Sequence, residues 1–166
     1  MAIDRSVNAP AVSPDLITKA VYYMGSDAVK EGEPFVYDTG HGTATNYDGL
    51  RHNQVVRPTA SGQTFAGVAT RNYPASTPGN GRLIEIALPG SRGVRIRVGA
   101  SASQGAVLQF AYKASVGSKI FKAAGSPHAL TALQIGDAIL RQTVAAAGLA
   151  QADLADSPYA AGVSES

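Results

Sequence analysis

Short apolar segments alternate with clusters of Gly, Pro, Asn and Asp from Leu16 onward, and this spacing predicts strands rather than helices. The clearest segment is 94–98, in which three aliphatic residues alternate with Arg95 and Arg97. Because successive side chains of a strand point to opposite faces, the aliphatic residues share one face and both guanidinium groups lie on the other. The pattern predicts an all-β domain, a small barrel or sandwich. Its expected strands are Ile17–Met24, Pro34–Tyr37, Gln54–Pro58, Thr64–Arg71, Arg82–Leu88, Val94–Val98, Ala106–Tyr112, Lys119–Lys122 and Ala138–Val144.

Two of these segments, 82–88 and 94–98, are expected to pair as a hairpin. The residues between them, Pro-Gly-Ser-Arg at 89–92, are typical of a turn. Glu85 points away from the aliphatic face of the first segment, so an arginine of the second segment would face it across the hairpin. We therefore expect both strands to belong to one sheet as direct neighbours.

The first 16 residues are expected to form an extended arm. Pro10 and Pro14 push their predecessors toward extended conformations and remove backbone donors. A fully extended arm of this length could span on the order of 50 Å, which is more than the radius of a domain of this size. We predict that Val7, Pro10, Val12 and Pro14 contact a neighbouring subunit.

The C-terminal end is expected to behave as an Ala/Gly-rich tail, residues 146–166, after a β-rich core at 17–145. Within the tail, 148–156 contains Leu149 and Leu154 in an Ala-rich setting, which favours a short helix. Another helical turn is expected at Thr131–Gln134. Leu149, Leu154, Arg95 and Arg97 complete the set of residues that we expect at an interface.

Composition narrows the classes of function. The 166 residues suit one domain, and the absence of cysteine excludes disulfides and thiolate metal sites. No apolar run reaches the roughly 18 residues of a membrane span, so we expect no membrane partner. Residues 1–145 carry 14 − 9 = +5 charges and the tail carries −3, but the arginines are dispersed. Because nucleic-acid binders gather their cations on one face or run, we expect no nucleic-acid partner.

The most distinctive motif is Asp38-Thr39-Gly40, the triplet that carries the catalytic carboxylate of aspartic proteases. A single triplet would need a symmetric dimer to bring two carboxylates together, and Asp-Thr-Gly also fits a turn after the strand 34–37. The run continues with His41-Gly42-Thr43, so Asp38 and His41 lie three residues apart, a spacing that does not promise the geometry of a serine-protease triad. We therefore expect no catalytic residue, and a dimeric protease using Asp38 is the alternative.

Metal and cofactor sites have little support. The three histidines, His41, His52 and His128, show no metal-ligand spacing, and no acidic loop of the calcium type is present. The Gly-x-Gly pairs at 40–42 and 79–81 lack the third glycine and the following helix of a phosphate-binding loop. The sequence therefore predicts no metal and no cofactor.

Five short segments between Lys30 and Val144 carry a resemblance to a known family. They are Glu31–Val36 with a Gly-x-Pro-apolar pattern, Phe65–Ala69 with Gly-Val-Ala, Ile84–Gly90 followed by Val94–Val98, Gln104–Leu108, and Ile135–Ile139 as a second copy of the Gly-Val-Ala signature. In this order they resemble the capsid decoration, or cement, proteins of tailed bacteriophages.

This resemblance implies a β-barrel-like protein, often trimeric, which binds the outer surface of the assembled head and has no catalytic residues. The expected partners are the major capsid protein, whose subunits it would bridge, and further copies of this chain. A carbohydrate-binding or adhesin-like module that uses tyrosines as a platform remains an alternative.

Overall fold

The computed structural model describes residues 16–38, 53–60, 62–78, 81–123, 138–155 and 163–164. These residues form strands and turns and contain no helix, which confirms the predicted all-β fold. It follows that the described ranges offer no helical segment able to cross a membrane. The strands are β1 (Thr18–Tyr23), β2 (Pro34–Tyr37), β3 (Gln54–Val56), β4 (Phe65–Ala69), β5 (Arg82–Ala87), β6 (Val94–Val98), β7 (Val107–Tyr112), β8 (Phe121–Ala123), β9 (Ala138–Leu140), β10 (Gly148–Leu154) and β11 (Val163–Ser164).

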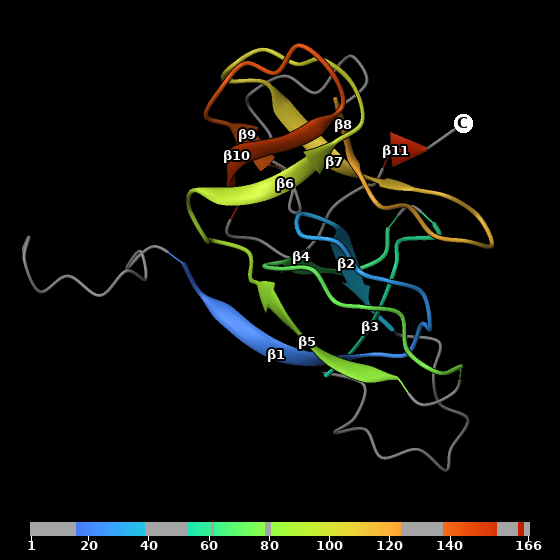
Figure 1. Ribbon diagram of the computed structural model, residues 1–166. Helices are drawn as coiled ribbons and strands as arrows, with labels where there is room; N and C mark the ends of the chain where they lie inside the picture. The colour runs from blue at the N-terminus through green and yellow to red at the C-terminus, as the bar shows by residue number, and fades with distance from the viewer. Residues whose placement is uncertain are drawn as a thin grey trace, which may run out of the picture.

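The first five strands close into a barrel, drawn in blue to green in Figure 1. Strand β1 pairs in parallel with β3 and antiparallel with β5, over the full register from Thr18 opposite Ala87 to Tyr23 opposite Arg82. Strand β2 lies between β3 and β4, and β4 pairs with β5. Closure pairs the backbone groups that an open sheet would leave at its edges.

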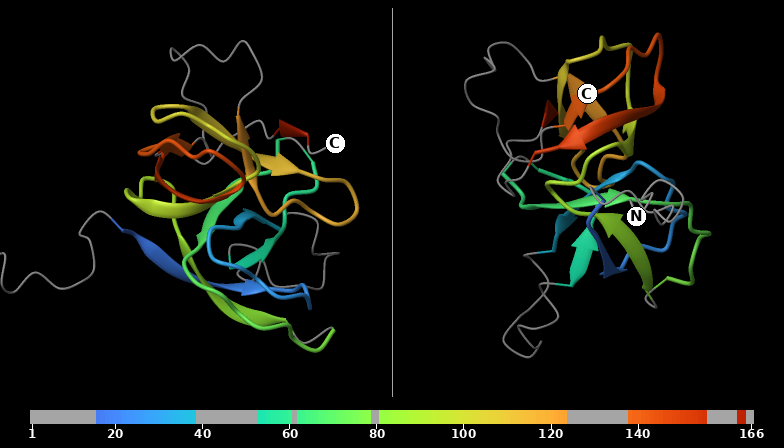
Figure 2. Two further views of the ribbon diagram at one scale, coloured as in Figure 1. Left: turned by 45° about the horizontal axis from the view of Figure 1, so that its top comes forward. Right: turned by 90° about the vertical axis from the view of Figure 1, so that its left-hand side faces the viewer.

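The second half of the chain forms a second ring beside the first (Figures 1 and 2). Its strands follow the order β7, β8, β6, β10 and β9, and a further pairing between β9 and β7 closes the ring. The short strand β11 adds to β7 in parallel, opposite Ala111 and Tyr112. The described residues therefore build two five-stranded barrels, each from consecutive parts of the sequence.

Strands β2 and β4 join the barrels because both of their faces are buried. Every residue of β4 is buried, and its apolar run Phe-Ala-Gly-Val-Ala has no polar alternation. Phe35 and Ala66 belong to the core of the first barrel, whereas Val36, Phe65 and Val68 belong to the core cluster of the second. A continuous apolar strand is what burial on both sides requires.

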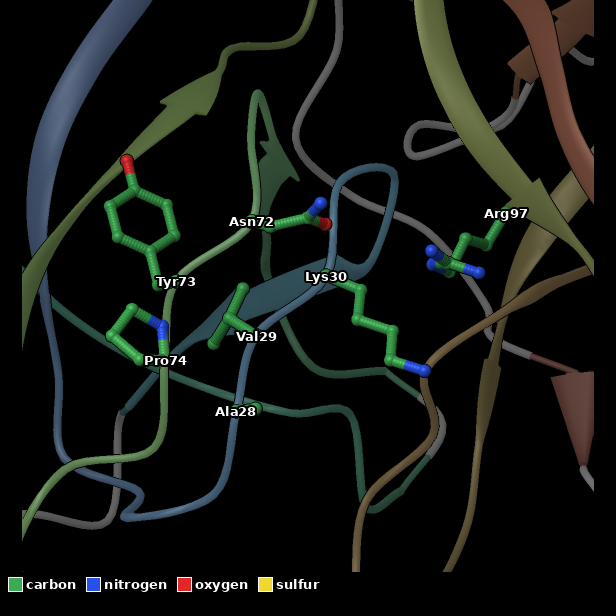
Figure 3. Close-up of a pocket in the computed structure, with 7 residues that line it drawn as sticks. All are labelled: Ala28, Val29, Lys30, Asn72, Tyr73, Pro74 and Arg97. Atoms are coloured by element: carbon green, nitrogen blue, oxygen red, sulfur yellow. The ribbon is translucent and has the colours of Figure 1, made fainter.

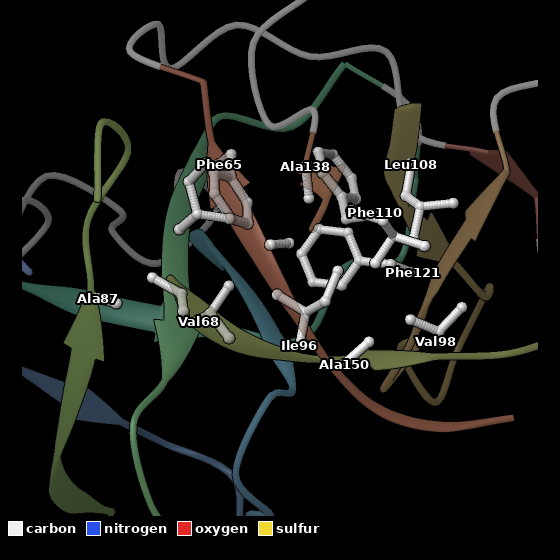
Figure 4. Close-up of a cluster of buried hydrophobic side chains, with 14 of the residues drawn as sticks. Phe65, Val68, Ala87, Ile96, Val98, Leu108, Phe110, Phe121, Ala138 and Ala150 are labelled. Carbon is white, nitrogen blue, oxygen red and sulfur yellow. The ribbon is translucent and has the colours of Figure 1, made fainter. Parts of the chain in front are cut away.

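Phe65 of β4 packs against two aromatic rings of the second barrel (Figure 4). Its ring stacks on Phe110, with centroids 5.8 Å apart and planes 5° from parallel. Phe121 approaches edge-on, with centroids 6.2 Å apart and planes at 79°. Offset-stacked and edge-on pairs add stabilisation beyond the apolar area that they bury, so the two barrels share one rigid seam.

Gly67 permits the close approach of β4 to β5. Its φ of +151° is one that residues with a side chain rarely adopt, and an added Cβ would lie 2.3 Å from the carbonyl oxygen of Ala87. That distance is far inside van der Waals contact, so a larger residue would have to push the two strands apart. The Gly-Val-Ala segment thus has a structural role in this fold.

The predicted hairpin between 82–88 and 94–98 is wrong. Strand β5 pairs with β1 and β4, while β6 pairs with β10 and β8, so the link between them crosses from one barrel to the other. Ser91 holds this link: it is fully buried, and its Oγ accepts a hydrogen bond from the Ile17 backbone amide and donates one to the Ile17 carbonyl. The turn residues at 89–92 therefore serve a crossover and not a tight turn between paired strands.

The helix expected at 148–156 is also wrong, because 148–154 form β10. Ala150, Ala152 and Leu154 are buried and alternate with Gln151 and Asp153, which is the period of a strand. Strand β10 lies between β6 and β9 in the second barrel. The helical turn expected at 131–134 falls outside the described residues.

Candidate functional site

A buried polar cluster lies where loops of the two barrels meet. Its centre is Arg57, directly after β3, with only 5% of its surface exposed. The Arg57 Nη2 donates to Glu33 Oε2 at 2.8 Å and to the Ala28 carbonyl at 2.9 Å. Its Nη1 donates to the Tyr23 hydroxyl and to Asp27 Oδ2. Glu33, 1% exposed, thereby receives the cation that a buried carboxylate needs.

The second barrel contributes to the same cluster. The Lys119 ammonium group lies 3.1 Å from Asp27 Oδ2, and Gly117 packs so closely that an added Cβ would lie 2.3 Å from the Arg57 Cβ. The Pro58 carbonyl accepts hydrogen bonds from the Lys113 and Ser118 amides. The cluster therefore ties the loop between β7 and β8 to the first barrel.

The protonation states in this cluster follow from its contacts. Burial would raise the pKa of Asp27, but hydrogen bonds from Tyr23, Arg57 and Lys119 outweigh burial and hold that pKa well below its usual value. Burial raises the pKa of Tyr23, and its hydrogen bond to Asp27 adds to the effect. For Arg57, burial acts to lower the pKa, and hydrogen bonds to Asp27 and Glu33 more than reverse this. At neutral pH the cluster thus holds a charged Asp27, a neutral Tyr23 and a charged Arg57.

A groove of about 550 Å³ lies next to this cluster, between the barrels (Figure 3). Its volume falls within the size range of ligand-binding clefts. Two segments of the first barrel line one side, and Arg97 on β6 of the second barrel lines the other. The lining residues are Ala28, Val29, Lys30, Asn72, Tyr73, Pro74 and Arg97.

The groove walls are held in place by the backbone. Val29 and Tyr73 exchange two backbone hydrogen bonds, of 3.1 and 2.8 Å, which fix the two first-barrel segments side by side. The Asn72 side-chain carbonyl accepts a hydrogen bond of 2.8 Å from the Glu31 amide. Arg97 is joined to this wall because its amide donates to the Gly32 carbonyl at 2.9 Å. The groove is therefore formed by the fold itself.

Gly32 sets the spacing between the two sides of the groove. Its φ is +84°, and an added Cβ would lie 2.8 Å from the Arg97 backbone nitrogen and 2.7 Å from the Leu149 side chain. Only glycine fits this conformation and this contact without strain. A residue of the Gly-x-Pro pattern thus positions Arg97 against the first barrel.

The cations of the groove lack acidic partners. No lining residue is acidic, and neither Lys30 nor the Arg97 side chain forms an ion pair with a described residue. The Arg97 Nε is buried and has no hydrogen-bond partner among the described residues. In Figure 3 the Asn72 amide and the Arg97 guanidinium face one another across the groove, and the Lys30 side chain extends so that its ammonium group lies below the Arg97 guanidinium in this view. The groove thus gathers donors of hydrogen bonds and positive charge.

Tyr73 is already engaged by its neighbours. Its hydroxyl accepts hydrogen bonds from the Glu85 amide at 2.6 Å and from the Arg71 Nε at 3.0 Å. The Arg71 guanidinium lies over its ring, 5.3 Å from the centroid. One face of the ring and its hydroxyl are therefore occupied, which disfavours Tyr73 as a stacking platform for a sugar ring.

The structure separates the interface residues expected from the sequence. Arg95 and Arg97 share the face of β6 opposite the buried aliphatic residues, as the alternation predicts. Arg95 is 54% exposed and lies 3.2 Å from Glu31, whereas Arg97 lines the groove. Leu149 is half-buried, and Leu154, 4% exposed, belongs to the core of the second barrel. The arm residues Val7, Pro10, Val12 and Pro14 lie outside the described residues.

Asp38 follows β2 directly, and its amide donates to the Gln54 carbonyl at 3.1 Å. The rest of its triplet, together with His41, His52 and His128, lies outside the described residues. Within the described ranges, no three His, Cys, Asp or Glu side chains gather in a way that could hold a metal ion.

The sequence did not reveal the contacts between Glu33 and Arg57 and between Glu31 and Asn72. The members of these sites come from loops 24 to 41 residues apart, so no local motif marks them. The only signal in the sequence was the Gly-x-Pro pattern at 32–34, which encloses Glu33.

No family model matches the sequence, and no curated protein matches it. Among solved structures, the chain is similar to the crystal structure of the head fiber gp8.5 N base in bacteriophage phi29, with a TM-score of 0.47 and 10% sequence identity. The match covers 86% of this chain and 97% of that chain. A likeness at this score and identity does not establish a shared fold or a shared function.

Proposed function

We propose that this chain is a structural protein of a tailed-phage virion, which decorates the outer surface of the assembled head. It would stabilise the head by bridging neighbouring subunits of the major capsid protein, and it would act as a homo-oligomer, a trimer. It would carry out no chemical reaction. Two observations support this role: the order of motifs resembles that of the decoration proteins, and the fold presents a groove at the junction of its barrels.

The observation that carries the proposal is the pair of barrels fused along Phe65, with a preformed groove at their junction. A decoration protein has to keep its shape while it holds two partners, and a shared aromatic seam and a buried ion pair between Arg57 and Glu33 support such a rigid shape. The segments of the resemblance that fall in the described ranges lie on structural positions, among them Gly32, Phe65 and Gly67. The resemblance therefore coincides with residues that shape this fold.

Binding to heads tests the proposal directly. The chain would be added in increasing amounts to phage heads prepared without it, and bound copies would be counted after sedimentation. A decoration protein saturates at a fixed ratio to capsid subunits and raises the temperature at which the heads rupture. Unsaturable adsorption, or saturation with no gain in head stability, would contradict the proposal.

Two further measurements separate the alternatives. An adhesin-like module would be retained by immobilised glycans, and an aspartic protease would cleave peptides in a manner that Asp38→Ala abolishes. Sedimentation of the free chain as a trimer, without either activity, is the outcome expected here. A monomer that binds glycans or cleaves peptides would replace our proposal with one of these functions.

The N-terminal arm has a separate role in this proposal. An arm that becomes ordered on a neighbour loses conformational entropy, which the buried apolar surface has to exceed, and several such contacts multiply a modest affinity. Removal of residues 1–14 is expected to lower occupancy on heads while the unfolding temperature of the free chain stays the same. Unchanged occupancy would show that the arm does not contribute to binding.

A further inference from the structure

We propose that the groove between the barrels binds an extended acidic segment of a partner polypeptide, with Arg97 and Lys30 as the residues that receive its carboxylates. This inference rests on the proposed function, because it names the chemistry by which the chain would hold a capsid subunit. It goes beyond that function in assigning one site and one type of ligand.

The charge of the groove is the first argument. Arg97 and Lys30 enter it from opposite barrels, and no acidic residue lines it. Elsewhere in the described chain, exposed cations near the junction have partners: Arg95 pairs with Glu31 and Lys119 with Asp27. A cation pair left open at a preformed cleft complements a ligand that brings negative charge.

The donor geometry is the second argument. The partly exposed Arg97 side chain forms no hydrogen bond or ion pair with a described residue, and its buried Nε, like that of Arg57, has no partner. Guanidinium groups match carboxylates with two parallel hydrogen bonds, and such charge-assisted pairs are stronger than neutral ones. The Asn72 carbonyl is engaged by the Glu31 amide, so its NH2 group remains as a donor at the groove.

The shape of the groove favours a peptide over a sugar. Ala28, Val29 and Pro74 give it apolar walls beside the cations, which suits a chain that alternates acidic and apolar side chains. Its aromatic residue, Tyr73, has one ring face under Arg71 and its hydroxyl already hydrogen-bonded. Recognition is thus left to charge and to the apolar walls, and not to stacking.

Arg95 provides a matched control. It lies two residues from Arg97 on the same strand, and each substitution by alanine removes one positive charge. Arg95 is outside the groove and has Glu31 as its partner. A general effect of net charge would therefore appear equally in Arg95→Ala and Arg97→Ala, whereas an effect of the groove would appear only in Arg97→Ala.

The experiment measures binding of the full chain to two kinds of probe. The first is a short fluorescent peptide of alternating glutamate and valine, with a twin in which glutamine replaces glutamate. The second is the preparation of heads that lack the chain. We expect Arg97→Ala and Lys30→Ala each to weaken binding of the acidic peptide and of heads roughly ten-fold, and Arg95→Ala to change binding of the acidic peptide by less than about three-fold. The glutamine peptide should bind weakly to every variant, and added salt should weaken the acidic peptide.

Each outcome decides something different. Wild-type binding to heads, combined with an equal loss of peptide binding in Arg95→Ala and Arg97→Ala or with no loss in either, overturns the groove and leaves the decoration role in place. Absence of head binding by the wild type overturns the proposed function. Binding of the acidic peptide to the wild type and the variants then tests the groove by itself. Equal binding of both peptides, or preference for an acidic polysaccharide such as polygalacturonate, overturns the acidic-peptide assignment. Lys30→Ala alters an exposed side chain away from the core, so a folding defect in Arg97→Ala would not remove the test.

Discussion

Two cationic sites lie at the junction of the barrels, and they differ in what neutralises them. Arg57 is buried and meets Glu33, Asp27, Tyr23 and the Ala28 carbonyl within the chain. Arg97, by contrast, lines an open groove that has no acidic residue among its described lining, and its side chain forms no ion pair with a described residue. The two sites lie in adjacent parts of one junction, so their difference reflects what each does.

Burial explains the first site. An ion taken out of water costs several kcal/mol unless a partner and hydrogen bonds replace its hydration, and the Arg57 cluster supplies both. An exposed or half-exposed cation has water available and carries no such demand. A structural role therefore predicts a cation with ion-pair partners inside the chain, and a binding role predicts a cation without them.

Arg57→Met gives the largest expected effect. It leaves Glu33 as a buried charge without a cation, and the free energy of unfolding should fall by about 3–5 kcal/mol. Chemical denaturation measures this change. The double variant Arg57→Met with Glu33→Gln should recover part of the loss, because the uncompensated charge is then gone. A loss in the double variant equal to the sum of the losses in Arg57→Met and Glu33→Gln would show that the two residues are not energetically coupled.

Features that depend on neighbouring residues along one strand can be predicted from the sequence. Alternation at 94–98 placed both arginines of β6 on one face, because a strand shows its period in local sequence. The same alternation exists in β10, where Ala150, Ala152 and Leu154 face inward. Small alanine side chains give it little contrast with Gln151 and the rest of the Ala-rich setting, so the local sequence favours a helix where the structure has a strand.

Pairings across the chain could not be predicted in this way. The residues at 89–92 have turn chemistry, but they carry the chain from one barrel to the other, where Ser91 binds the Ile17 backbone. Whether a turn joins paired strands or crosses between barrels depends on contacts with distant residues. The groove has the same origin, because its two walls come from residues 28–30, 72–74 and 97.

Acidification should affect the Arg57 cluster more than the groove. The pKa of Asp27 is held low in the folded chain, where burial is outweighed by hydrogen bonds from Tyr23, Arg57 and Lys119. A lowered folded pKa stabilises the fold above the unfolded value, about 3.9, and that stabilisation is lost as pH falls through the folded pKa. Asp27→Asn should therefore flatten the decline in unfolding free energy below about pH 4.

Denaturation at several pH values between neutral and about pH 2 tests this expectation. Lys30→Ala serves as the comparison, because the lining of the groove contains no carboxylate that could titrate there. Its decline should follow that of the wild type. A slope for Asp27→Asn equal to the wild-type slope would mean that other carboxylates account for the acid sensitivity.

The smallest expected effect is on the stability of the groove variants. Lys30 is exposed and has no ion-pair partner among the described residues, so Lys30→Ala should change the free energy of unfolding by no more than about 0.5 kcal/mol. Arg95→Ala breaks a largely exposed pair with Glu31, which is worth about 0–1 kcal/mol. Chemical denaturation of Lys30→Ala, Arg95→Ala and Arg57→Met under the same conditions gives three unfolding free energies that can be compared directly. A loss for Lys30→Ala as large as that for Arg57→Met would make the groove part of the structural core and erase the distinction between the two cationic sites.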